Sequence, residues 1–158
     1  MKELKLVSFE DPILRRVSKP LKTIRDRYKR KIKAMFEIMY QNNGIGLAAP
    51  QVGWDAQVFI MNITGNTDDE HVLINPKIIE LGKDIVEYPE GCLSFPGIYG
   101  PVDRPQSVIV RAQNIDGKEI TFSDNGLMSR CMLHEIDHLN GEVFIDKAKK
   151  LYKGDDPL

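Results

Sequence analysis

Apolar residues recur at helical spacing near the N-terminus and predict a first helix over residues 25–42. Ile32, Met35, Phe36 and Met39 recur at helical spacing, and basic residues fill the side of the predicted helix that is expected to be exposed. This pattern is typical of a helix that packs one face against a core and leaves the other face in water. The run QNNGIG, which follows at once, predicts the end of the helix.

Shorter apolar runs in the middle of the chain predict strands. QVFIMN at residues 57–62 and VLINPKII at residues 72–79 are rich in β-branched and apolar residues. Residues 107–122 contain two further runs of this kind on either side of Asp116-Gly117, a dipeptide favoured in hairpin turns. We therefore expect at least one β-hairpin in this part of the chain.

A second helix is expected after these strands. Asp124 can cap its N-terminus, and the helix is predicted to run to about Asn140, with Gly141 ending it. Because helix, strands and helix succeed one another without regular alternation, the order favours an α+β fold. We expect antiparallel or mixed sheets packed around a central C-terminal helix, together with the N-terminal helix.

Length and composition indicate an ordinary soluble chain. Its 158 residues suit one domain, which we place at residues 1–150, followed by a short tail at 151–158 that is expected to be disordered. The formal net charge of −1 gives no indication of a specific nucleic-acid partner. No apolar run approaches the roughly 20 residues of a membrane span, and the N-terminus lacks signal-peptide features. We expect a cytoplasmic monomer without membrane contact.

The clearest chemical signal is the segment CMLHEIDHLNG at residues 131–141. It carries His134, Glu135 and His138 in the pattern H-E-x-x-H. Positions four apart lie on one face of a helix, so both imidazoles can bind the same ion. A carboxylate beside such an ion can move a proton during hydrolysis, so Glu135 is a candidate general base. A surface helix with a chance pattern is the alternative.

Two histidines leave a tetrahedral metal short of a protein ligand, and Cys131, Glu142, Asp146 and Cys92 are the candidates. Cys131 lies about 7–8 Å back along the helix axis from the midpoint of the histidines. A cysteine with a metal–sulfur bond of about 2.3 Å does not easily span that distance. Glu142 follows the helix stop, and Cys92 needs the fold to deliver it or is simply a small buried residue. Spacing alone leaves the third ligand open.

Three motifs together give the chain a family resemblance. They are GIGLAAPQ at residues 44–51, EGCLS at residues 90–94 and HEIDH at residues 134–138. In this order and at this spacing the chain resembles the peptide deformylases, and it is similar to their shorter bacterial type. The segments DPILRR and RPQSVIVRAQNIDGKE agree as well, so the likeness covers about residues 4–147.

The resemblance implies a metal-dependent hydrolase that removes the formyl group from the N-terminal formyl-methionine of nascent polypeptides, giving formate. It implies that Cys92, His134 and His138 hold one divalent ion, with water in the fourth position. One thiolate and two imidazoles suit Fe(II), Zn(II), Ni(II) or Co(II), and Fe(II) is the expected physiological metal. Contact with the ribosome during synthesis is expected to be transient.

The resemblance also assigns roles around the reacting group. Glu135 is implied to carry the proton from water to the departing amine. The side-chain amide of Gln51 and the backbone N–H of Leu93 are implied to stabilise the oxyanion of the tetrahedral intermediate. Without the resemblance, Gln51 is more simply a turn residue after Ala49-Pro50.

A further group of residues is expected to bind the substrate. Ile45 and Gly46 are implied to pair with the peptide main chain as a strand does, and Gly91 is placed with them. Leu127 and Cys131 lie seven and three positions before His134, on the same helix face, and can wall a pocket for the methionine side chain. The simpler alternative is that both belong to the core.

The resemblance implies a structural ion pair between Glu90 and Arg104 behind the site. At one position the chain departs from the family, because the glutamine that usually precedes HEIDH is Leu133 here. Such a change can alter the hydrogen bonds around metal ligands. It leaves open a deformylase-like hydrolase that acts on another acyl amine.

Two other functions remain as alternatives. The first is an H-E-x-x-H metallopeptidase in which Glu142 or Asp146 is the third ligand. The second is a protein without catalytic activity, because the two cysteines and the two motif histidines match the inventory of a Cys2His2 structural zinc site. These alternatives differ in whether metal binding needs Cys92 or Cys131.

Overall fold

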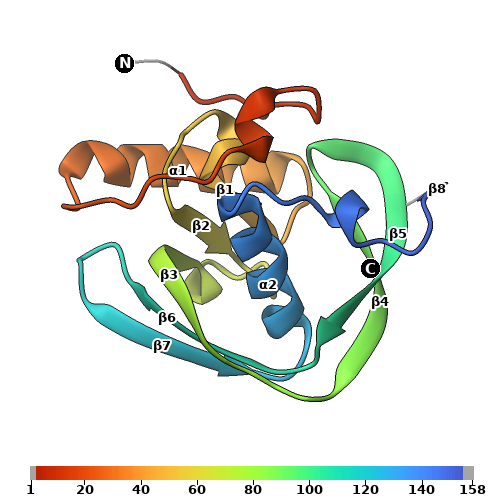
Figure 1. Ribbon diagram of the computed structural model, residues 1–158. Coiled ribbons are helices and arrows are strands. Elements are labelled where there is room, and N and C mark those ends of the chain that lie inside the picture. The colour runs from red at the N-terminus through yellow and green to blue at the C-terminus, as the bar shows by residue number, and fades with distance from the viewer. Residues whose placement is uncertain (1–2, 155–158) are drawn as a thin grey trace.

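The computed structural model describes residues 3–154 and has an α+β fold, as the element order predicts. Two α-helices and eight strands make up its regular structure in this range, together with four short 3-10 helices. Figure 1 shows α2 at the centre of the molecule, with strands of two separate sheets around it. The α-helices are α1 (Asp26–Gln41) and α2 (Leu127–Leu139).

The strands form two sheets, and every pairing is antiparallel. The first sheet has the order β1-β2-β3-β6-β7 and the second has the order β4-β5-β8. The strands are β1 (Gly46–Ala48), β2 (Val58–Met61), β3 (His71–Leu81), β4 (Ile85–Cys92), β5 (Phe95–Pro105), β6 (Val108–Gln113), β7 (Glu119–Asp124) and β8 (Tyr152–Lys153). The 3-10 helices are Pro12–Arg15, Ala49–Val52, Thr67–Asp69 and Phe144–Asp146.

Helix α1 forms where the apolar periodicity predicts it. The four apolar residues named above are buried in a cluster that includes Trp54 and Leu47, while the charged positions face outward. The helix ends at Gln41 with Asn42 as its C-cap, and Asn43 then takes a positive φ of 57°, a conformation that asparagine tolerates. The backbone turns here toward Gly44 and the first strand.

The first sheet confirms three predicted segments. Strands β2 and β3 coincide with the two central apolar runs, and β6 and β7 form the hairpin around Asp116-Gly117. All four residues of β2 are buried, because this strand lies between α1 on one face and α2 on the other. The result is a two-sided core, with one apolar cluster on each face of the sheet.

The second sheet contains the long hairpin of β4 and β5, which the apolar pattern does not predict. Prolines at positions 89, 96, 101 and 105 interrupt both strands, and proline is disfavoured in strand interiors. The strands still pair from Ile85↔Pro105 to Gly91↔Tyr99. The predicted tail contributes β8, which pairs with β5, and residues 155–158 of that tail lie outside the described residues.

Helix α2 lies between the two sheets and contacts β1, β2, β6 and β7 of one and β5 of the other. The N-cap residue of α2 is Gly126 rather than the predicted Asp124, but Asp124 still contacts the first turn, because its Oδ2 accepts hydrogen bonds from the backbone N–H of Gly126 and Ser129 at 2.9 and 2.8 Å. Nine consecutive residues of α2, 131–139, are buried. Within residues 3–154, no helix is long and apolar enough to cross a membrane.

Candidate active site

Cys92 at the end of β4 lies beside the two histidines of α2. One potential ligand atom from each of Cys92, His134 and His138 falls within 4.8 Å of the others, and this is the one such cluster in the described range. The Cys92 Sγ lies 3.3 Å from His138 Nε2. Atoms this close can surround one ion at about 2.0–2.3 Å after small side-chain rotations. The donor set of one thiol and two imidazoles also suits a divalent transition metal.

The carboxylate of Glu90 orients His134 for such an ion. Its Oε1 lies 2.8 Å from His134 Nδ1, so the other ring nitrogen is left for the metal. Arg104 donates to both Glu90 oxygens, from Nε at 2.5 Å and from Nη2 at 2.9 Å. Burial acts to raise the pKa of Glu90, but the hydrogen bonds from Arg104 and His134 outweigh it and hold the pKa well below its usual value. Glu90 is therefore ionised at neutral pH.

His138 is fully buried, and its surroundings keep it neutral. Burial lowers the pKa of His138 well below its usual value, and the neighbouring His134 and Arg104 lower it further. Its Nε2 faces Cys92, while its Nδ1 has no hydrogen-bond partner among the described residues. A neutral imidazole is the form that binds metals.

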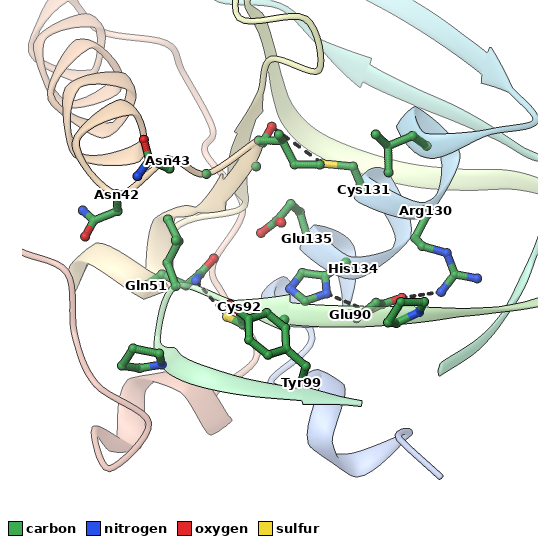
Figure 2. A pocket seen from close by; sticks show the side chains of 18 of the residues that line it. Asn42, Asn43, Gln51, Glu90, Cys92, Tyr99, Arg130, Cys131, His134 and Glu135 are labelled. Carbon is green, nitrogen blue, oxygen red and sulfur yellow. Dashed lines mark hydrogen bonds and ion pairs between the residues drawn. The ribbon is translucent and has the colours of Figure 1, made fainter. Parts of the chain in front are cut away.

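Glu135 points into the same space from α2 (Figure 2). Its side chain is almost completely buried, and Oε1 has no hydrogen-bond partner within residues 3–154. Burial raises the pKa of Glu135 to about 7, although the charge of His134 opposes this shift. A carboxyl group with a pKa near neutrality can both accept and return a proton.

Gln51 is fixed so that its amide nitrogen faces Cys92. The backbone N–H of Ala48 donates to Gln51 Oε1 at 3.0 Å, which leaves Nε2 as the end directed at the cluster. That nitrogen lies 3.2 Å from Cys92 Sγ (Figure 2), and it lies 3.4 Å from Ser94 Oγ. Leu93, the other predicted oxyanion residue, lines the same cavity. The structure thus brings both predicted donors beside the candidate ligands.

A cavity of about 510 Å³ contains these groups, and two strand edges border it. Gly44, Ile45 and Gly46 line one side, at the start of β1, and residues 88–92 of β4 line another. In the described chain β1 pairs only with β2, and β4 pairs only with β5. Both strands therefore keep one edge without a strand partner. The predicted pocket residues Leu127 and Cys131 also line this cavity, and the Cys131 Sγ lies 3.8 Å from the Ile45 carbonyl oxygen.

Gly46 is closely surrounded by two of these side chains. A Cβ atom at position 46 would lie 2.6 Å from Cys131 Sγ and 2.8 Å from Glu135 Oε2. Real Cβ atoms essentially never show such short distances, so a side chain at position 46 must displace the thiol, the carboxylate or both. Glycine is therefore required where β1 passes the candidate base.

We expect Gly46→Ala to lower kcat/KM by about 100-fold, because a displacement of about 1 Å at a reacting group can cost that much. Steady-state kinetics with a formylated tripeptide measures the effect. Gly154→Ala is the matched control, because a Cβ there meets nothing closer than 3.9 Å. Equal kinetics for the Gly46→Ala variant and the wild type would contradict the tight packing of Glu135.

The competing ligand candidates lie elsewhere or remain uncharged. Asp146 accepts a hydrogen bond from Arg15 at 2.6 Å, and Glu142 is half exposed and lies 3.6 Å from Lys147. Cys131 is buried, which raises the pKa of its thiol well above the usual value, and it does not belong to the ligand cluster. Cys131 thus lies beside the cavity as a neutral thiol, in agreement with the helix-reach argument.

No role was predicted from the sequence for two charged residues of α2, Asp137 and Arg130. Asp137 accepts from Arg104 Nη1 at 2.8 Å and from Lys147 Nζ at 3.0 Å, so Arg104 joins Asp137 to Glu90. Arg130 donates to Glu90 Oε2 at 2.6 Å. Its spacing could have indicated a role for Arg130, because it lies about one helical turn before His134.

Leu133 occupies the position where the family usually has glutamine. Its side chain is buried in the apolar cluster that contains Phe59, Met61 and Ile136, and it does not line the cavity. The departure therefore lies where α2 packs against the first sheet.

Comparisons with known proteins agree with the motifs. The family model of polypeptide deformylase matches residues 3–154. The peptide deformylase of Hydrogenovibrio crunogenus is 45% identical over 151 residues, which cover 96% of this chain and 89% of the relative. The chloroplastic/mitochondrial peptide deformylase 1B of Arabidopsis thaliana is 44% identical over 146 residues, covering 91% of this chain and 54% of the relative.

Solved structures of the same family have the same fold. The peptide deformylase of Thermotoga maritima superposes with a TM-score of 0.89 at 35% identity, covering 95% of this chain and 100% of that one. The Synechococcus elongatus peptide deformylase, solved in complex with actinonin, gives a TM-score of 0.88 at 39% identity, with 93% and 79% of the two chains covered. With a matched family model, close relatives and a shared fold, this chain belongs to the polypeptide deformylase family.

Proposed function

We propose that the chain removes the formyl group from the N-terminal formyl-methionine of nascent polypeptides with Cys92, His134 and His138 as the ligands of one divalent metal ion. The observation that carries this proposal is the cluster of these three ligand atoms within 4.8 Å, beside a buried carboxyl group without a partner. Glu135, Gln51 and Leu93 act on the formyl group. Glu90 and Arg104 hold the ligands in place.

A divalent ion bound by these ligands activates water and polarises the formyl carbonyl. The protein then has to move one proton. Glu135 accepts it from the attacking water at a carboxylate oxygen and delivers it to the amine nitrogen as the C–N bond breaks. Its pKa of about 7 suits both steps. The products are formate and a free amino terminus.

Negative charge develops on the former carbonyl oxygen during this reaction. Gln51 Nε2 and the backbone N–H of Leu93 donate to that oxygen in the proposed mechanism. The fixed hydrogen bond from Ala48 to Gln51 Oε1 supports this role, because the amide is already oriented before substrate arrives. Orientation in advance avoids a reorganisation cost in the transition state.

The substrate main chain is proposed to lie as an extended strand between the open edges of β1 and β4. Ile45 and Gly46 offer main-chain groups on one side, and Gly91 lies on the other. The methionine side chain enters the apolar part of the cavity beside Leu127 and Cys131. Recognition through backbone groups suits an enzyme that must accept many different nascent chains.

The remaining expectations stay proposals. Fe(II) is the proposed physiological metal, and Zn(II), Ni(II) or Co(II) are the alternatives for the same donor set. We propose that the chain works in the cytoplasm as a monomer, with transient contact to the ribosome. The proposed substrate, a formylated nascent chain, supports the cytoplasmic location and the contact with the ribosome.

Formate release provides the test of the proposed function. Protein purified anaerobically with Fe(II) is expected to release one formate per formyl-Met-Ala-Ser and to leave the peptide bonds intact, as mass spectrometry of the products would show. The acetylated tripeptide is the control for the size of the acyl group. Absence of formate would contradict the proposal, and cleavage of internal peptide bonds would favour a metallopeptidase.

A further inference from the structure

Arg130 is held in a fixed position between α2 and the β4–β5 hairpin. Its Nη1 donates to Glu90 Oε2 at 2.6 Å and to the Val102 carbonyl oxygen at 3.0 Å, and its Nη2 donates to the Val86 carbonyl oxygen at 2.7 Å. Only 12% of its side chain is exposed. Figure 2 shows the guanidinium turned toward the strand that carries Glu90. Three acceptors on two strands leave this planar group little freedom.

Tyr88 contacts the Arg130 guanidinium from strand β4. The Arg130 Cζ lies 5.6 Å from the centroid of the Tyr88 ring, within the range of a cation–π interaction. Tyr88 belongs to β4 and is partly exposed. The two side chains therefore form a wall, which has the aliphatic stem of the arginine and the aromatic ring as its apolar parts.

This wall lies between two cavities. The cavity that contains Cys92 and Glu135 has a volume of about 510 Å³, and a neighbouring cavity has a volume of about 260 Å³. Tyr88, Leu127 and Arg130 line both of them. The second cavity is bordered otherwise by Val86, Pro105, Gln106, Asn125 and Gly126. The hollow behind the wall is thus roughly half the size of the candidate active site.

We propose that Arg130 determines the depth of the pocket for the first side chain of the substrate by separating it from the second cavity. This inference rests on the proposed function, because it assigns the substrate side chain to the end of the cavity beside Leu127. Removal of the arginine side chain connects the two hollows. A longer or wider first side chain then fits, whereas methionine loses part of its contact surface.

The effect on specificity is separable from an effect on the metal ligands. Without Arg130, Glu90 still accepts two hydrogen bonds from Arg104 and still contacts His134 Nδ1. The orientation of His134 therefore has independent support. Loss of the wall should change which side chain is preferred more than it changes metal binding.

Three variants test the wall. Arg130→Ala removes it, and Arg130→Met keeps a side chain of similar length while it removes the hydrogen bonds. Tyr88→Ala opens the wall from β4 without touching Glu90. Arg111 on β6 is exposed and pairs with Glu119 at 2.8 Å. The variant Arg111→Ala is the control for the loss of an arginine outside the wall.

The measured quantity is the ratio of kcat/KM for formyl-2-naphthylalanyl-Ala-Ser to that for formyl-Met-Ala-Ser. We expect Arg130→Ala and Tyr88→Ala each to raise this ratio by about tenfold or more, the scale on which apolar pockets discriminate side chains. Arg130→Met and Arg111→Ala should leave the ratio within about threefold of the wild type. Metal content, measured by elemental analysis, should stay at the wild-type level in all four variants.

A binding experiment separates this inference from the proposed function. Calorimetry with the unformylated peptides 2-naphthylalanyl-Ala-Ser and Met-Ala-Ser should show the same change in preference without any chemistry. An unchanged preference in both Arg130→Ala and Tyr88→Ala would overturn the wall. The wall would also be overturned if Arg130→Ala and Arg130→Met changed the preference equally while Tyr88→Ala did not change it. Such a result would mean that Arg130 acts on the preference through its hydrogen bond to Glu90. Absence of formate with a changed binding preference would reject only the proposed reaction.

Discussion

Replacement of Glu135 by glutamine is expected to lower kcat for formate release by about 1,000-fold, within the range that general acid–base groups contribute. Glutamine has nearly the same shape and fits the buried site beside Gly46, but it cannot accept a proton from water. The Oε1 atom of Glu135 has no partner among the described residues, so the substitution breaks no hydrogen bond at that atom. The fold and the ligand cluster should therefore survive the change.

The measurement compares kcat from steady-state formate release with metal content and with the thermal midpoint of unfolding. Glu142→Gln is the matched control, since it replaces a carboxylate that is half exposed, beyond the end of α2. That control should retain wild-type kcat. Activity of Glu135→Gln within tenfold of the wild type, at full metal content, would exclude Glu135 as the proton carrier of the proposed mechanism.

Cys92→Ala is expected to weaken metal binding by about 100-fold or more, since even residues that only orient ligands contribute about 10- to 100-fold. The change leaves two imidazoles, and the neighbouring carboxylate of Glu90 is already engaged by Arg104 and His134. Competition with a chromophoric chelator measures the affinity of the purified protein for Zn(II) or Co(II). Formate release should fall in parallel with metal occupancy.

Cys131→Ala is the matched control for this prediction. Its thiol is neutral and lies outside the ligand cluster, so the variant should bind metal as the wild type does. Loss of metal in Cys131→Ala would support a Cys2His2 structural site. Retention of metal in Cys92→Ala would instead support a carboxylate ligand such as Glu142.

The spacing of apolar residues predicted most of the fold, because most helices and strands bury one face or both faces. Helix α1, strands β2 and β3 and the β6–β7 hairpin all follow runs of apolar residues. The β4–β5 hairpin escaped prediction, because its many prolines and its exposed positions resemble a loop. The hairpin is held by the pairing of β4 with β5 and by the ion pairs of Glu90 and Arg104 with residues of α2, and these contacts leave no periodic apolar pattern in the sequence.

The candidate site shows the same division. His134, Glu135 and His138 are neighbours on one helix, so their spacing alone indicated a shared site. Cys92 could not be chosen from spacing, because only the hairpin brings it to the helix; the family resemblance supplied it. Arg130 was missed for a related reason, since two of its three acceptors are backbone carbonyls that a sequence pattern does not reveal.

The open edges of β1 and β4 bear on a hazard common to sheet proteins. A strand without a neighbour presents free backbone groups to other chains and can start edge-to-edge aggregation. Here both strands border the cavity that contains Cys92 and Glu135. An extended peptide bound between the two edges, as we propose, would occupy backbone groups that could otherwise pair with another copy of the chain.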